Sequence, residues 1–176
     1  MRYLTKVTIG IALLLSAAIF GFFYAWVCST MWGLDGTDPR VAIKAMQAMN
    51  GSVRNAVFAP AFFGTPFALW VAATLVWRQE SQRSALLFAA AGCVYFFLGL
   101  VLTMRVNVPM NETLALVEVP ESIEEAKAIW EAYSSKWQVW NITRTITSGL
   151  AFVLALAGVF AYSSREKGAS RLSLAG

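Results

Sequence analysis

The chain has 176 residues, of which 58% are hydrophobic and only 14% are charged, with a formal net charge of +4. Because a soluble domain carries about 25% charged residues, this composition indicates a membrane protein. Histidine is absent, which excludes Ser–His triads, His-ligated zinc or copper and bis-His haem. Two cysteines are too few for a cysteine metal cluster, and the diffuse positive charge does not suggest a nucleic-acid partner.

Four stretches are long and apolar enough to cross a membrane, which requires about 20 mostly apolar residues. They are residues 7–27, 57–77, 84–104 and 142–162, and none has an ionisable residue in its central half. The first stretch exceeds the ~7–15 residues of a signal-peptide core and lacks a clear cleavage site, so we expect it to be retained. The sequence therefore predicts an all-α integral membrane four-helix bundle that forms one domain over residues 1–162.

The two long segments between spans are predicted to be helical. Asp38 is a good N-cap and Pro39 suits the first helical position, and apolar residues recur after them at helical spacing. Ser122 and Glu125 match a capping box. The apolar pattern that follows continues into the fourth span, which predicts one helix from residue 123 to residue 162, ~60 Å long at ~1.5 Å per residue.

Positive charges are dense in three short segments, namely the N-terminus, residues 78–83 and the polar tail at residues 163–176. The other positive charges are spread over the two long segments, which also hold most of the acidic residues. Because Lys and Arg in short loops stay cytoplasmic, we predict that both termini and the tail are cytoplasmic. The helical extensions then lie on the non-cytoplasmic side.

The two cysteines are predicted to be unpaired. Cys28 lies near the non-cytoplasmic end of the first span and Cys93 near the middle of the third. Their depths then differ by ~15 Å at ~1.5 Å per residue, whereas the Cα atoms of a disulfide lie about 5.5 Å apart. We expect two free thiols that are buried in the bundle.

Polar residues gather at the non-cytoplasmic ends of the third and fourth spans. Asn107 and Asn111 share a helix face on either side of Pro109, and Asn141 and Arg144 share a face with Trp137. Other residues at similar depth complete a candidate site. Its members are Asn50, Asn55, Asn107, Asn111, Glu112, Trp137, Trp140, Asn141 and Arg144.

Two interpretations of this set remain open. The tryptophans could form an interfacial belt, Arg144 could extend to the headgroups, and the asparagines could simply join helices. In the functional interpretation, the asparagines and Arg144 converge on an apolar, aromatic-lined cleft that binds an oxygen-bearing ring compound. Amide and guanidinium groups offer fixed donors to carbonyl or phenolate oxygens.

Several motifs resemble those of the anthrone oxygenase-like family of small four-span membrane proteins. Residues 107–111, Asn-Val-Pro-Met-Asn, are similar to the family's N-x-P-x-N signature at the end of the third span. Residues 137–145 are similar to its W-x-x-W-N-x-x-R-T pattern, and residues 45–50, Asn55 and residues 62–65 also resemble family blocks. The resemblance covers most of the chain.

This resemblance implies oxidation of an aromatic or other lipophilic molecule by O2. The activity for which the family is named converts the central CH2 of an anthrone to the C=O of an anthraquinone. Because the chain lacks histidine, the implied reaction uses no metal and no cofactor. Asn107, Asn111, Asn141 and Arg144 would donate to a substrate anion in a pocket of low dielectric, and Trp137 and Trp140 would stack on its rings.

In this interpretation Asn50, Asn55 and Glu112 complete the substrate site, and Glu112 is the nearby carboxylate. Most members of the family are bacterial, so a bacterial inner membrane is the expected location, with the lipid bilayer as partner. The alternative is a non-enzymatic four-span protein that binds a lipophilic ligand or serves as an accessory subunit of a membrane complex.

Overall fold

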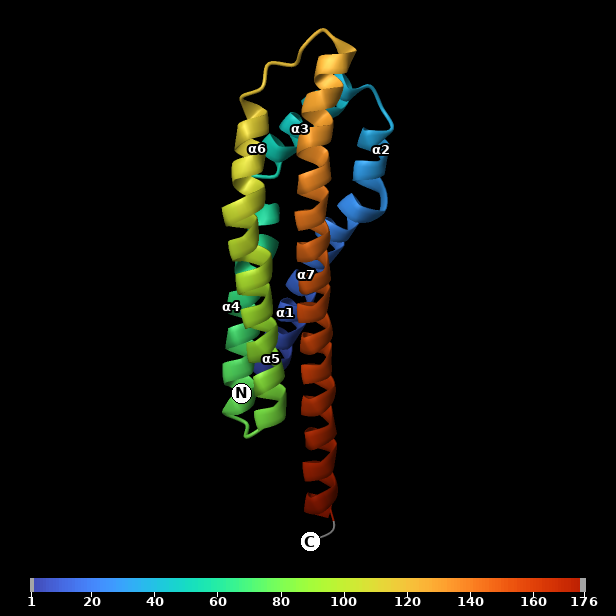
Figure 1. The fold of residues 1–176 in the computed structure, drawn as a ribbon. Helices are drawn as coiled ribbons and strands as arrows, with labels where there is room; N and C mark the ends of the chain where they lie inside the picture. Colours follow the sequence, from blue (N-terminus) through green and yellow to red (C-terminus); the bar gives the residue numbers. More distant parts are fainter. Residues whose placement is uncertain (1, 175–176) are drawn as a thin grey trace.

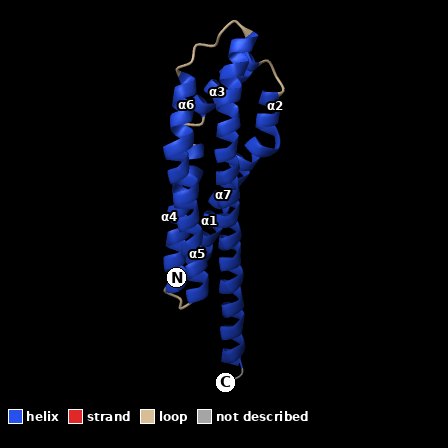
Figure 2. Cartoon of the chain, viewed as in Figure 1, coloured by secondary structure: helices blue, strands red, loops and turns tan. Residues whose placement is uncertain are grey.

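The computed structural model describes the backbone of residues 2–174 and the side chains of residues 3–165. In this part of the chain the structure is helical, without strands (Figures 1 and 2). Segments labelled η are π-helical. The elements are α1 (Arg2–Ala25), η1 (Trp26–Thr30), α2 (Met31–Asp35), α3 (Pro39–Ser52), α4 (Phe58–Trp77), α5 (Gln82–Tyr95), η2 (Phe96–Val101), η3 (Thr103–Asn107), α6 (Val108–Ala115) and α7 (Ile123–Leu174).

Four helical rods are long and apolar enough to cross a membrane, as predicted. They are Tyr3–Asp35, Phe58–Trp77, Gln82–Ala115 and Ile123–Arg165. Three of them are longer than the apolar stretches that predict them. In the first and third rods the π-helical segments carry the helix on beyond the apolar stretch, and in the fourth the extension before residue 142 is already helical.

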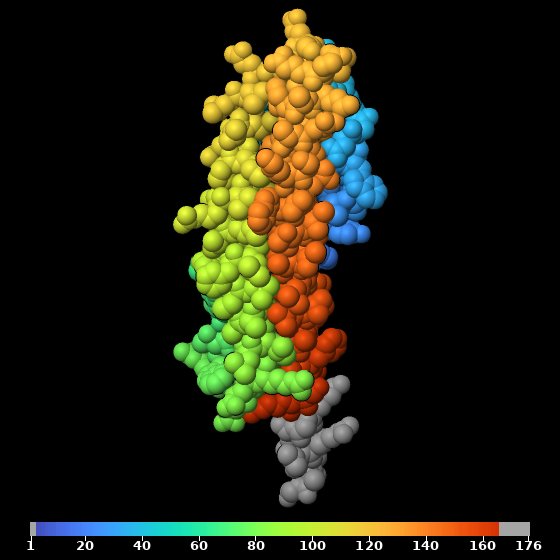
Figure 3. Space-filling view, in the orientation of Figure 1, coloured from blue at the N-terminus to red at the C-terminus, as the bar shows by residue number. Residues whose placement is uncertain are grey.

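The rods form an elongated bundle whose two ends differ (Figure 1). The α4–α5 turn, the N-terminus and the last turns of α7 lie towards one end. The other end carries α2, α3, α6 and the first turns of α7, and we call it the extension end. Figure 3 shows the helix that runs from α5 to α6 packed beside α7 along the bundle. The predicted helical extensions are therefore present.

The predicted helix starts are confirmed. Asp38 Oδ1 accepts a hydrogen bond of 2.9 Å from the Arg40 backbone N–H, with Pro39 at the first helical position of α3. Ser122 Oγ accepts one of 3.3 Å from the Glu125 backbone N–H at the start of α7. The Ser122 hydroxyl also donates to the Glu124 carboxylate at 3.1 Å.

The fourth rod is one continuous helix through residue 162, as predicted. It continues to Leu174, so the polar tail is helical up to that residue, whereas the sequence predicts that the last ten residues of the chain are loose. No proline interrupts the sequence of this segment, which is compatible with a continuing helix. Residues 175–176 of the predicted tail lie outside the described residues.

The extension end has its own core, which positions the site below it. Trp26, Met46, Leu114 and Tyr133 belong to a buried apolar cluster that joins η1, α3, α6 and α7. Asp35 fixes the end of α2 to α7, since its carboxylate accepts from Trp130 Nε1 at 2.9 Å, Ser134 Oγ at 2.7 Å and Gln138 Nε2 at 2.8 Å. These contacts hold α2 against α7 at the extension end.

Both cysteines are free thiols, as predicted, but the prediction that they are buried was wrong. Cys28 and Cys93 are exposed on the outside of the bundle. The argument from depth excludes a disulfide but does not determine which face of a helix a residue occupies. In spans that are apolar on every face, the sequence pattern does not separate inward from lipid-facing positions.

Candidate functional site

A cavity of about 1050 Å³ lies between the four rods near the extension end. Aromatic side chains of α1, η1 and α4 form much of its wall, and the α3–α4 connection with the first turn of α4, residues 52–59, also lines it. Six predicted site residues also line it: Asn50, Asn55, Asn111, Glu112, Trp137 and Arg144. The cavity is thus mostly apolar with a few convergent polar groups, which is the usual character of a small-molecule site.

Arg144 is the most unusual group in the cavity wall. Its side chain is only 5% exposed, so the alternative in which it extends to the headgroups is not what the structure shows. The guanidinium carbon lies 4.6 Å from the ring centroid of Phe23 and 4.9 Å from that of Trp137. No carboxylate among residues 3–165 forms an ion pair with it. Two aromatic rings, rather than an acid, therefore hold this buried cation.

Asn141 orients the Arg144 guanidinium. Its Oδ1 accepts a hydrogen bond of 3.0 Å from Arg144 Nε, and its Nδ2 donates one of 3.2 Å to the Phe23 backbone carbonyl. Asn141 is buried but does not line the cavity. Within the described part of the chain, Arg144 Nη1 and Nη2 make no hydrogen bond. Four of the five guanidinium N–H groups thus remain available to a ligand.

Asn111 presents a second donor to the cavity. Its Oδ1 accepts from Tyr133 Oη and from Trp137 Nε1, each at 2.9 Å. The indole N–H can only donate, so the amide oxygen must face Trp137 and the Nδ2 group must face away from it. Among the described residues, Asn111 Nδ2 has no hydrogen-bond partner. Asn50 supports this arrangement from α3, with Nδ2 donating to Tyr133 Oη at 3.4 Å.

Asn107 is completely buried, and neither its Oδ1 nor its Nδ2 has a hydrogen-bond partner in the described structure. It does not line the cavity, although Thr103 and Asn111, four residues before and after it, both do. Leaving a buried amide unpaired costs about 1–3 kcal/mol per group. Such groups in a native fold call for a functional explanation or a bound water.

The remaining predicted residues divide between the rim and the outer surface. Glu112 pairs with Arg54 across the rim at 3.3 Å, and both side chains are more than half exposed. Asn55 uses its side chain in the turn before α4, where Oδ1 accepts from the Val57 and Phe58 backbone N–H groups. Trp140 is 38% exposed and does not line the cavity, so a membrane-interface position suits it better than ring stacking.

The sequence model of the anthrone oxygenase family matches residues 51–154. The chain belongs to the anthrone oxygenase family. The match covers α4, α5, α6 and much of α7, including the two motifs with Asn107, Asn111, Asn141 and Arg144. No curated protein and no solved structure matches the chain significantly.

Sequence reasoning missed two residues that shape this family member's site. Phe23 stacks on Arg144 from α1, outside the matched range, and Tyr133 donates to Asn111 from α7. Tyr133 lies four residues before Trp137, so its helical spacing was a usable signal. Phe23 lies in a uniformly apolar span, which gave no such signal.

The residue pattern also did not predict the π-helical segments η1 and η3. They contribute Trp26 and Thr103 to the cavity wall, and such segments are frequent at functional sites.

Proposed function

We propose that this anthrone oxygenase family member oxidises a lipophilic aromatic compound of the anthrone type with O2 inside the cavity. The observation that carries the proposal is the buried Arg144 guanidinium. It is held between Phe23 and Trp137 in an aromatic wall, and its Nη atoms have no hydrogen-bond partner among the described residues.

The proposed reaction needs only substrate and O2. The substrate CH2 becomes C=O, one oxygen atom of O2 enters the product, and the other leaves as water, so the substrate carbon supplies all four electrons. Loss of one C–H proton gives an anion whose charge is shared with the ring oxygen. Electron transfer from this anion to O2 and recombination form a peroxide anion at the same carbon, which takes up a proton to give a hydroperoxide. Loss of the second C–H proton then breaks the O–O bond, giving the ketone and hydroxide, and the hydroxide takes up a proton to leave as water.

The protein's part in this proposal is to stabilise the anion. Arg144 Nη and Asn111 Nδ2 donate to the ring oxygen, where the negative charge develops, and fixed donors in an apolar site are most effective there. Asn141 keeps the guanidinium in place. Glu112, the acidic residue on the cavity wall, accepts the first proton at the rim, where its exposure lets that proton pass to solvent.

Metal-free chemistry is part of the proposal. The chain has no histidine, and residues 3–165 contain no group of three His, Cys, Asp or Glu side chains that could hold a metal ion. A purified preparation treated with a chelator should keep its full activity under this proposal.

The experiment that tests the proposal uses the full-length protein in lipid nanodiscs with anthrone as substrate. O2 uptake and anthraquinone formation should occur in a one-to-one ratio and above the rate of spontaneous oxidation. Arg144→Lys keeps the charge but loses the planar fork, and we expect kcat to fall about 100-fold, the typical effect of removing a transition-state donor. The matched control is Arg105→Lys, an exposed arginine outside the cavity, which should leave kcat unchanged. Equal rates for the two variants would contradict the proposal.

One observation favours a second candidate, binding of the same class of ligand without turnover. Glu112, the carboxylate on the cavity wall, is more than half exposed. No carboxylate among the described residues pairs with Arg144. This candidate predicts that anthrone binds in the cavity but that no quinone forms above the spontaneous rate.

We also propose that the protein lies in a bacterial inner membrane with both termini in the cytoplasm. The apolar rods and the dense positive charge of the short segments support this arrangement. The extension end, and with it the α3–α4 connection that lines the cavity, then faces away from the cytoplasm.

A further inference from the structure

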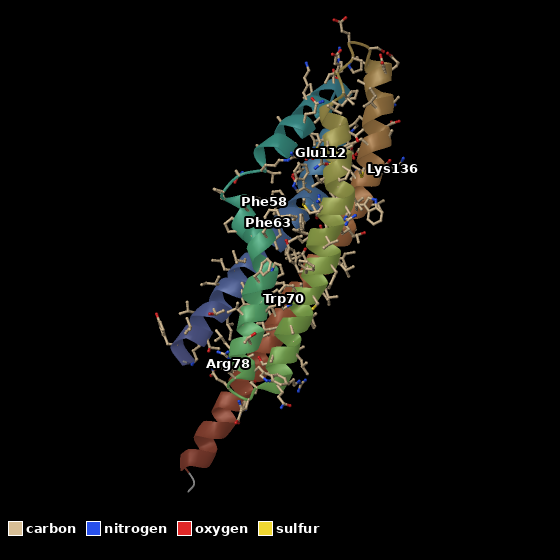
Figure 4. All side chains as sticks on the ribbon, turned by 90° about the vertical axis from the view of Figure 1, so that its left-hand side faces the viewer. Phe58, Phe63, Trp70, Arg78, Glu112 and Lys136 are labelled. Carbon is tan, nitrogen blue, oxygen red and sulfur yellow. The ribbon has the colours of Figure 1, made fainter. Side chains whose placement is uncertain are left out.

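The cavity reaches the outer surface of the bundle on its lipid-facing side. Phe63 of α4 and Met104 of η3 both line the cavity, yet their side chains are 47% and 44% exposed. Helix α4 packs closely against α5 but only slightly against η2, so the second and third rods diverge towards η3. Figure 4 shows Phe58 and Phe63 projecting from α4 on the side of the molecule that also carries Glu112. Phe63 and Met104, the two exposed wall residues, mark an opening between α4 and η3.

This opening lies at the depth of the hydrocarbon region. Phe63 comes five residues after Phe58, the first residue of the second rod, so it lies about 8 Å inside that end at ~1.5 Å per residue. Met104 likewise lies within the third rod, eleven residues before its end at Ala115. Exposed apolar residues around the opening, such as Phe67 and Phe97, match a lipid environment.

The aqueous side of the cavity is lined by a polar segment. Residues 52–59 line the cavity at the α3–α4 connection, and the Arg54–Glu112 ion pair at 3.3 Å joins this segment to α6. A lipophilic molecule dissolved in the bilayer therefore meets the cavity at the apolar residues Phe63 and Met104, whereas a molecule dissolved in water meets the polar residues Arg54, Asn55 and Glu112.

The cavity is also larger than a three-ring nucleus requires. Its volume of about 1050 Å³ is at the upper limit of the ~300–1,000 Å³ that holds drug-sized ligands, and a three-ring ketone is smaller than such ligands. Arg144 and Asn111 line the cavity from α7 and α6, whereas the part of the wall that α1 and α4 contribute is apolar and aromatic. The space between the donors and the opening thus fits an apolar substituent.

We propose that the ligand enters from the lipid phase through the opening between Phe63 and Met104, and that it is an aromatic ketone or phenol with a long apolar substituent. The oxygen end lies at Arg144 and Asn111, and the substituent extends through the cavity towards the opening. This inference takes the position of the ligand oxygen from the proposed function. It does not require that the protein oxidises the ligand.

The first test locates the substituent. The probe is an anthrone that carries a ten-carbon chain ending in a photoreactive diazirine, added without O2 to the protein in phosphatidylcholine nanodiscs. Illumination and peptide mass spectrometry should place the label on cavity-lining positions of α1 and α4, such as Ile19, Phe22 and Phe62. Excess unlabelled anthrone should suppress it. Labelling only of lipid-facing positions such as Phe67 and Phe97, without suppression, would overturn the inference.

The second test concerns the route. Met104→Trp narrows the opening, and the matched control Phe97→Trp places the same ring on the lipid-facing surface away from the cavity. Stopped-flow fluorescence without O2 should show anthrone association about tenfold slower in Met104→Trp, and unchanged in Phe97→Trp. Phe63→Ala, which widens the opening, should accelerate association. Equal association rates in all three variants would overturn the route.

The outcomes separate this inference from the proposed function. Label inside the cavity together with no quinone formation in air would reject the oxidase and keep the lipid-phase ligand. Quinone formation in air together with label only on the outer surface would keep the oxidase and reject this inference. Absence of binding by both the probe and anthrone would reject both.

Discussion

Arg144 Nε donates a 3.0 Å hydrogen bond to Asn141 Oδ1, and Asn141 in turn donates to the Phe23 carbonyl. Both residues lie on α7, three positions apart, whereas Phe23 lies on α1. The bond fixes the plane of the guanidinium between the Phe23 and Trp137 rings. The terminal nitrogens are then the part of Arg144 that a ligand can reach. Asn141 is thus a positioning residue, while Arg144 and Asn111 are the donors.

Two asparagines of the third rod should respond oppositely to the same substitution. Asn107 is buried without hydrogen bonds in the described structure, so Asn107→Leu should raise the free energy of unfolding by about 1–3 kcal/mol. Asn111 accepts from Tyr133 and Trp137, so Asn111→Leu leaves two buried donors unpaired and should lower that free energy by a similar amount. Denaturant unfolding in detergent measures both values.

Activity provides the second half of this comparison. If the Asn107 amide is kept for ligand binding or a bound water, Asn107→Leu should be more stable than the wild-type protein and yet less active. A loss of stability in Asn107→Leu would show that the amide has a structural partner, and the functional interpretation of this position would then be wrong.

The start of α3 should depend on pH in acid. The hydrogen bond from the Arg40 side chain, with a further one from its backbone N–H, lowers the pKa of Asp38 from 3.8 to about 2. Because the folded pKa lies below the unfolded value, the ionised cap stabilises α3 at pH values above about 4 and this contribution is lost as the pH falls towards 2. Hydrogen exchange of the Arg40 amide should show that loss.

Asp38→Asn is the control for this titration. Asparagine also caps helices but does not titrate, so the Arg40 amide of this variant should show no change in protection between pH 4 and pH 2 beyond the intrinsic exchange rate. A wild-type protein whose protection changes only above pH 4 would contradict the low pKa of Asp38.

The orientation in the membrane predicts which loops are accessible from outside the cell. Single cysteines at Gln82 and Glu124, in a background with Cys28→Ser and Cys93→Ser, lie at opposite ends of the bundle. We expect a membrane-impermeant maleimide to label position 124 in intact cells and position 82 only after lysis. Labelling of position 82 in intact cells would reverse the proposed topology.

Local signals in the sequence predicted the fold well. Asp38 and Ser122 mark true helix starts because a cap acts within one turn and needs no tertiary information. The spacing of apolar residues predicted that α7 runs unbroken through residue 162, because the 3.6-residue period does not depend on what the helix contacts. The four spans were also predictable, since the bilayer sets their length.

The site was only partly predictable. The motifs with Asn111 and Arg144 named residues that do line the cavity, but Asn141, Asn107 and Trp140 do not line it. The third rod contains π-helical turns, which alter the face of every later residue and which spacing rules for an α-helix ignore. The contribution of Phe23 depends on which helices pack together, and the residue pattern of a uniformly apolar span does not indicate this packing.

Isotope incorporation tests the central claim most directly. Full-length protein in nanodiscs is given anthrone under ¹⁸O2 in unlabelled water, beside a sample without protein and one with Arg144→Lys. The account predicts enzyme-dependent anthraquinone with one ¹⁸O atom per molecule, and a rate close to the protein-free sample for Arg144→Lys. Quinone formed no faster than in the protein-free sample, or at the wild-type rate in Arg144→Lys, would contradict it.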